Sequence, residues 1–77
     1  PFNPTTTIGY SIADDVKNLQ ISIFDIRGRL VDRLHSGAKS RGEYEIIWNA
    51  SHLSSGVYFV HMVANDFIFN KKIMLIK

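Results

Sequence analysis

The stretch that decides the fold reads Asn49-Ala50-Ser51-His52-Leu53-Ser54-Ser55-Gly56-Val57-Tyr58-Phe59-Val60. Its first half is rich in asparagine and serine, whose side chains bond to the nearby backbone and so favour turns. Its second half begins at a glycine and continues as valine, tyrosine and phenylalanine, which fit a pleated and half-buried surface. The stretch therefore predicts a loop that leads directly into a β-strand.

The rest of the chain also alternates between extended runs and turns. The ordered runs alternate with period two, and none follows the period of 3.6 residues that a helix requires. The runs that we predict as strands are Thr5–Ile12, Leu19–Asp25, Leu30–Leu34, Glu43–Trp48, Val57–Ala64 and Phe67–Ile76. Short, regularly spaced strands with turn signals between them are typical of a sandwich or small barrel. We expect an all-β fold, an immunoglobulin-like β-sandwich of about seven short antiparallel strands.

The breaks between the runs carry turn chemistry. Asp25-Ile26-Arg27-Gly28 has Asp first and Gly fourth, which predicts a type I turn, with Gly28 left-handed in a bulged hairpin. Ser36–Gly42 is predicted to be a longer hairpin loop, and Asn65-Asp66 a tight turn. Asp14-Asp15 and Lys17-Asn18 are expected to interrupt the first two strands.

Length and composition limit what the chain can be. It has 77 residues, no cysteine, 45% hydrophobic residues and a net charge of +2. Its few basic residues are scattered among acids, so a nucleic-acid partner is not expected. The apolar runs are far shorter than the ~20 residues of a membrane-spanning helix, so no membrane insertion is expected. Because the chain begins with Pro1, we expect residues 1–77 to be a single domain excised from a larger protein.

No catalytic residue, metal site or cofactor site is expected. His35, His52 and His61 match no zinc-binding spacing. Ser54-Ser55-Gly56 lacks the first glycine of a nucleophile elbow. A calcium site at Asp14-Asp15 is a weak alternative, because the oxygen-rich loop that calcium prefers is missing.

Two aromatic residues have structural interpretations. Trp48 shares a face with Tyr44 and Ile46, which favours a place in the core over an exposed sugar-stacking platform. Tyr58 follows a turn and begins a late strand, as in the tyrosine corner of Greek-key sandwiches, where the hydroxyl bonds to the backbone a few residues upstream. Leu53 would then close one end of the core, and Gly56 would allow the tight entry into the strand.

These segments, taken in order, resemble the C-terminal sorting domain of proteins exported by the type IX secretion system of Gram-negative bacteria. The matching segments are Pro1-Phe2-Asn3-Pro4-Thr5-Thr6-Thr7, Asp25-Ile26-Arg27-Gly28-Arg29, the Trp48 strand, the Leu53-to-Tyr58 entry, and the closing strand Lys71-Lys72-Ile73-Met74-Leu75-Ile76-Lys77. The strand order is also similar to that of an immunoglobulin-like domain of flagellar hook-cap proteins.

The resemblance implies a non-catalytic address label for a cargo domain upstream in the same chain. The cargo would pass through the periplasm to the outside or the cell surface, and its partners would be the type IX secretion machinery and a sortase-like peptidase. The candidate recognition residues are Asp25, Gly28, Arg29, Leu53, Gly56, Tyr58, Lys71, Lys72 and Lys77.

Two interpretations of the terminal strand Phe67–Ile76 stay open. It could offer a sheet edge to the secretion machinery, since strand addition is a common recognition mode. Alternatively it is ordinary sheet whose lysines protect an edge from aggregation. A second function also stays open, in which the chain is a structural or accessory module, such as a hook-cap-type assembly domain, a spacer or a carbohydrate-binding module of a larger extracellular enzyme.

Overall fold

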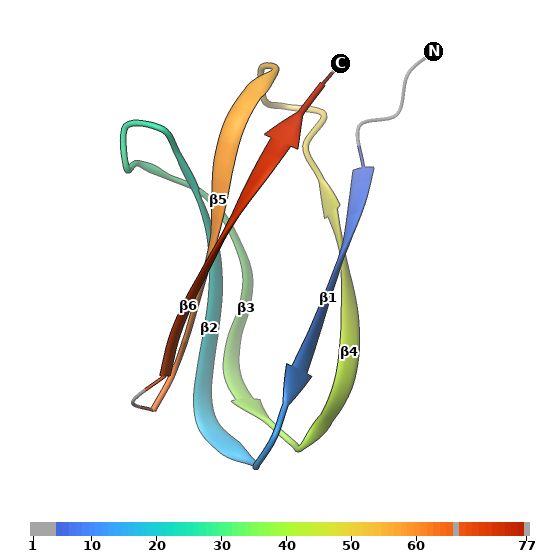
Figure 1. Ribbon diagram of the computed structural model, residues 1–77, viewed down its shortest axis with the longest axis vertical. Helices are drawn as coiled ribbons and strands as arrows, with labels where there is room; N and C mark the ends of the chain where they lie inside the picture. Colours follow the sequence, from blue (N-terminus) through green and yellow to red (C-terminus); the bar gives the residue numbers. More distant parts are fainter. Residues whose placement is uncertain (1–4, 66, 77) are drawn as a thin grey trace.

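The computed structural model describes residues 5–65 and 67–76, and this part of the chain forms a two-layer β-sandwich (Figure 1). The predicted all-β architecture is confirmed, with fewer strands in the described residues than the seven or so expected. The strands are β1 (Thr5–Ile12), β2 (Val16–Asp25), β3 (Leu30–Lys39), β4 (Gly42–Asn49), β5 (Gly56–Ala64) and β6 (Phe67–Leu75). The described residues contain no helix that is long and apolar enough to cross a membrane.

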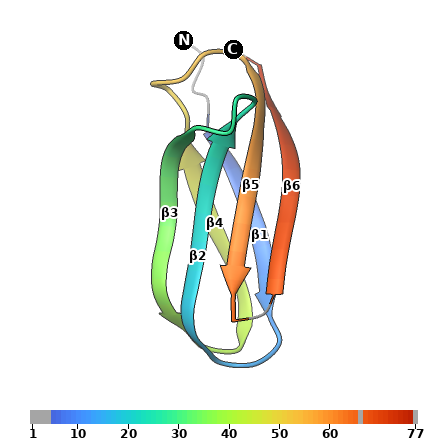
Figure 2. The ribbon, with the colours of Figure 1, turned by 90° about the vertical axis from the view of Figure 1, so that its left-hand side faces the viewer.

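The two sheets are unequal in width. One has the two strands β1 and β4, and the other has four strands in the order β3-β2-β5-β6. Figure 2 shows the four-stranded sheet in front, with β4 and β1 behind it. Every pairing is antiparallel. The strand order places β2 and β5 at the centre of the wide sheet, in agreement with their long apolar runs.

Two predicted boundaries were wrong. Ser36–Gly42 is not a long loop, because β3 continues to Lys39 and only Ser40 and Arg41 separate it from β4. Ser36 and Gly37 favour turns locally, but in the fold their backbone pairs with Gln20 and Leu19 of β2. Lys17-Asn18 likewise lies inside β2, where a register irregularity absorbs it. In both places, pairing with a neighbouring strand overrides local turn preference.

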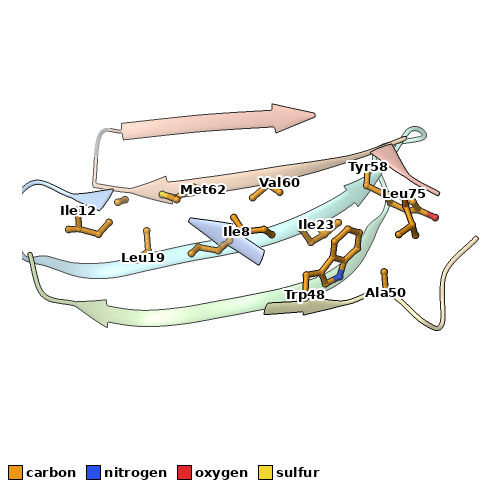
Figure 3. Packing of buried hydrophobic residues seen from close by; sticks show 12 residues of the cluster. Ile8, Ile12, Leu19, Ile23, Trp48, Ala50, Tyr58, Val60, Met62 and Leu75 are labelled. Atoms are coloured by element: carbon orange, nitrogen blue, oxygen red, sulfur yellow. The ribbon is translucent and has the colours of Figure 1, made fainter. Parts of the chain in front are cut away.

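The core lies between the sheets and follows the predicted alternation. Leu19, Ile21 and Ile23 of β2 are fully buried. Trp48 of β4 packs against them and is only 1% exposed, which confirms that it belongs to the core. Figure 3 shows its indole beside Ile23 and Ala50. Burying a side chain of this size is a main source of stability in a domain that has no disulfide.

The unequal sheets leave part of β6 uncovered. Phe67 pairs with Ala64, and Phe69 pairs with Met62, so both phenylalanines lie on the core side of the wide sheet. Even so, Phe67 is 56% exposed and Phe69 is 45% exposed. The opposing sheet has only two strands and does not reach across this end of β6. Near the other end of β6, Leu75 is buried in the core.

Candidate functional site: the turn end and strand β6

The β2–β3 turn is organised by the backbone and carboxylate of Asp25. The Gly28 amide donates to the Asp25 carbonyl at 3.0 Å, and Gly28 has a φ of 81°. This is the predicted turn with a left-handed glycine, and the pairing of β2 with β3 has a register shift between Ile23 and Phe24, just before the turn. One carboxylate oxygen of Asp25 accepts the amides of Arg27 and Arg29, both at 2.9 Å. The Asp-x-x-Gly-Arg segment is therefore a structural unit.

The charge of Asp25 is stabilised by the same turn. The hydrogen bond from the backbone amide of Arg29 is the largest cause that lowers the pKa of the Asp25 carboxyl below its ordinary value of 3.8. The Arg29 side chain adds to this, because its Nε donates to the second carboxylate oxygen at 2.9 Å. The Arg27 amide contributes as well. Hydrogen bonds to a carboxylate favour its charged form, so the turn is most stable when Asp25 is ionised.

The β4–β5 loop is anchored by Tyr58. The Tyr58 hydroxyl donates to the carbonyl oxygen of Ser54 at 2.7 Å, which confirms the predicted tyrosine corner. The Tyr58 ring lies edge-on to Trp48, with centroids 5.7 Å apart. Leu53 packs against the core from the loop, and Gly56 enters β5 with a φ of 155°, which an L-residue rarely adopts. The loop is thus joined to the centre of the molecule.

Sequence reasoning missed the partner of the tryptophan. The Trp48 indole N–H donates to a carboxylate oxygen of Asp32 at 2.8 Å. The imidazole of His52 lies 3.4 Å from the same oxygen. Asp32 has no local signal, because it is 16 residues from Trp48 and sits in an ordinary alternating run. Only the buried indole, which needs an acceptor, indicates that such a partner exists.

Six of the predicted recognition residues gather at one end of the sandwich, which we call the turn end. It consists of the β2–β3 turn, the β4–β5 loop and the last residues of β6 (Figure 1). Asp25 pairs with Tyr58, and Gly56 pairs with Leu75, so the three segments lie close together. The six residues are Asp25, Gly28, Arg29, Leu53, Gly56 and Tyr58.

Of the predicted lysines, Lys71 and Lys72 lie along β6, away from the turn end. Lys71 and Lys72 are both exposed in β6 and point to opposite sides of the wide sheet. Lys77 lies outside the described residues, as do the Pro1–Pro4 segment and Asp66. The structure thus separates the predicted recognition residues into the turn end and the edge strand β6.

Strand β6 also exposes apolar side chains that the sequence reading did not single out. Phe67, Ile68 and Phe69 are each 45% or more exposed. The rings of Phe67 and Phe69 are nearly parallel, with centroids 6.4 Å apart. In the sequence, this run looks like any buried strand. Phe67 and Phe69 are exposed because the two-stranded sheet does not cover this end of β6, and no local sequence pattern indicates that.

The three histidines serve separate structural contacts. A ring nitrogen of His35 donates to the Gly37 carbonyl, and one of His61 donates to the side-chain oxygen of Asn70. His52 lies beside Asp32. Within residues 5–65 and 67–76, no three His, Asp or Glu side chains are grouped as metal ligands would be. Asp15 of the weak calcium alternative accepts the Arg41 amide at 2.7 Å, which joins two turns.

Comparison with protein families identifies the chain. The family described as the secretion system C-terminal sorting domain matches residues 1–77. The chain belongs to this family. Comparisons with curated proteins and with solved structures gave no match. The sorting domain is a C-terminal signal for type IX secretion, and a protein that carries it is secreted or placed on the cell surface. Recognition by the type IX machinery is therefore the role of the domain.

Proposed function

We propose that the secretion machinery reads the sorting domain as a folded sandwich and contacts it through strand β6. The observation that carries this proposal is the exposure of β6: it pairs only with β5, and its residues from Phe67 to Lys72 are all exposed. An edge strand offers unpaired backbone groups, which a partner can extend as a further strand. Lys71 and Lys72 add positive charge to this edge.

The turn end has a supporting part in this proposal. Tyr58, Leu53 and Gly56 hold the β4–β5 loop against the core, and Leu75 brings the end of β6 to the same place. Asp25 and Gly28 form the neighbouring turn. These residues keep the contact strand in position. Arg29 is the exception, because its side chain is 69% exposed even though its Nε is bonded to Asp25, and its exposed part can contact a partner at the turn end.

The remaining steps of export follow from recognition of the folded domain. Residues 1–77 act as one non-catalytic domain at the end of a larger exported protein, with the cargo upstream. The cargo reaches the periplasm first, and the folded tail is recognised there. A sortase-like peptidase then removes the tail.

The test is an export assay with point variants. The domain is fused to the end of a periplasmic reporter, in strains with and without the secretion apparatus, and reporter outside the cell is measured. The double variant Lys71→Glu/Lys72→Glu should lower export strongly. Lys17→Glu is the matched control, since Lys17 is also an exposed strand lysine but lies in β2. Normal export of the double variant would reject β6 as the contact.

Deletion of Lys72–Lys77 provides a second arm of the same assay. It should abolish export, but it also removes Ile73 and Leu75 from the core. For that reason the folded state of each variant is checked by the fluorescence of Trp48. Loss of export in a folded variant supports recognition, whereas loss of export together with unfolding shows only that the signal must be folded.

The accessory-module alternative has less support. A carbohydrate-binding module stacks sugars on exposed aromatic rings, and the Trp48 ring is buried against Ile23 and Tyr58. The exposed phenylalanines of β6 lie on the core side of the wide sheet, so they do not form an outward platform. Export of the reporter by the isolated domain distinguishes the two functions.

A further inference from the structure

The side of the sandwich between β1 and β6 is open. Within residues 5–65 and 67–76, β1 pairs only with β4, and β6 pairs only with β5, so each strand has one free edge. The two strands run in opposite directions, and they lie on the same side of the molecule (Figures 1 and 2). On the opposite side, the edge strands β3 and β4 are joined at one end by Ser40 and Arg41. We call the region between the free edges of β1 and β6 the open side.

Three hollows follow one another along the open side. The first, of about 240 Å³, lies between Thr6–Ile8 and Lys71–Ile73. The second, of about 180 Å³, is lined by Tyr10 and Met62 together with Phe67 and Phe69. The third, of about 250 Å³, continues past Ile12 to Ala13. The hollows run the length of β1, as a groove for an extended chain would.

The free edge of β1 carries none of the usual devices that block strand addition. Its sequence, Thr-Thr-Thr-Ile-Gly-Tyr-Ser-Ile, contains no charged residue and no proline. All eight residues pair with β4 without a bulge. The other strands at the sheet edges do carry such devices, since β3 has register shifts, β4 has Glu43 and Glu45, and β6 has two lysines. β1 is the regular, uncharged edge of the described fold.

The exposed core side of β6 indicates what would fill the groove. A third strand beside β1 would face β6 across the sandwich, because packed sheets lie ~10 Å apart and neighbouring strands ~4.8 Å apart. It would cover Phe67 and Phe69 with the apolar residues of its inner face. It would also meet Lys71, which occupies the same row as the two phenylalanines. A strand beside β6 would not cover this row.

We propose that the open side binds one extended segment of a partner protein, which pairs with β1 as a third strand and carries alternate apolar residues and one acidic residue toward Phe67, Phe69 and Lys71. Charge complementarity with Lys71 selects the acidic residue, and the stacked phenylalanines select the apolar ones. The proposal does not depend on which strand the secretion machinery reads.

The experiment uses an eight-residue peptide, the length of β1. The fluorescein-labelled probe alternates valine and threonine and has one glutamate in a valine position. Binding is followed by fluorescence anisotropy, and hydrogen exchange locates the paired amides. We expect binding with new protection of amides in Thr5–Ile12. The same peptide with methylated amides on alternate residues should lose binding in one of its two patterns, because one row of amides faces β1.

Alternate residues of β6 supply matched controls. Phe69→Ser should weaken binding, whereas Ile68→Ser should not, because Ile68 points to the other side of the same strand. Lys71→Glu should weaken binding of the glutamate peptide by roughly fivefold, and a lysine in the peptide should restore it. Lys17→Glu, an exposed lysine of β2 that lines none of the three hollows, should have little effect. Trp48 fluorescence confirms that each variant is folded.

Three results would overturn the proposal. The first is no binding of the probe at millimolar concentration. The second is an equal loss of binding in Phe69→Ser and Ile68→Ser, or protection of β6 in place of β1. The third is a concentration-dependent dimer of the free protein with protected β1 amides, which would make a second copy the occupant of the groove. None of these readouts involves the secretion apparatus, so failure of the export assay and failure here are distinguishable.

Discussion

Tyr58 and Tyr44 make the same hydrogen bond in different surroundings. Each hydroxyl donates to the carbonyl of the residue four positions earlier, at 2.7 Å. Tyr58 is buried against Trp48, whereas Tyr44 is half-buried near the surface. The Tyr58 bond to Ser54 is partly buried and the Tyr44 bond to Ser40 is exposed, so water replaces a lost hydroxyl more easily at Ser40 than at Ser54.

We therefore expect unequal effects when each hydroxyl is removed. Tyr58→Phe should lower the free energy of unfolding by ~0.5–1.5 kcal/mol, the net value of one hydrogen bond. Tyr44→Phe should lower it by less. Thermal or urea denaturation of both variants checks the difference. An unchanged Tm for Tyr58→Phe would show that the tyrosine corner does not support the loop.

The Asp25 carboxylate gives the stability a pH dependence. The pKa of Asp25 is lower in the folded protein than its ordinary value of 3.8, mainly through the Arg29 amide. Its stabilising contribution is therefore complete above the unfolded pKa and is lost as the pH falls through the folded pKa. Urea denaturation from pH 6 down to about pH 2.5 should show stability falling below about pH 4.

Asp25→Asn is the matched variant, because asparagine keeps an oxygen that accepts the amides of Arg27 and Arg29 but does not ionise. We expect a flatter dependence of stability on pH in this range. If the variant and the native protein lost stability in parallel on acidification, the turn would not be the source of the effect.

At the scale of the element, Gly28 of the β2–β3 hairpin and Gly9 of β1 differ in whether their backbone conformation requires a glycine. Gly28 has a φ of 81°, whereas Gly9 lies in regular β1 and is absent from the residues with positive φ. A Cβ at Gly9 would meet only the Tyr44 carbonyl at 3.9 Å, an ordinary contact. Gly28→Ala should cost about 1–2 kcal/mol through left-handed strain, whereas Gly9→Ala should be neutral or slightly stabilising. Denaturation of the two variants tests this contrast.

The strands and turns also show which structural features could be predicted from the sequence. The sequence predicted the start of β5 at Gly56, the Asp25 turn and the burial of Trp48. Each of these predictions uses a pattern of residues that are close together in the chain. The length of β3 was not predicted, because its last residues are held by pairing with β2. Asp32 and the exposed phenylalanines were missed for the same reason. Their surroundings are set by strands distant in sequence, and no local pattern reports them.

At the scale of the whole molecule, the two sheets share one core. Trp48 of the narrow sheet packs with Ile23 and Tyr58 of the wide sheet. Neither sheet can keep its buried face covered without the other. We therefore expect a single cooperative unfolding transition, in which Trp48 fluorescence and far-ultraviolet circular dichroism coincide. Separate midpoints for the two signals would show that the sheets unfold independently.

The imbalance of the two sheets has a further consequence for the order in which the molecule opens. β6 is paired to the wide sheet along one side, and Leu75 is the only buried side chain among its described residues. Local fraying of β6 from β5 in the native state, before the cooperative transition, therefore leaves the indole enclosed by β2, β4 and β5. A force applied to the C-terminal end of β6 would therefore act first on the pairing between β5 and β6.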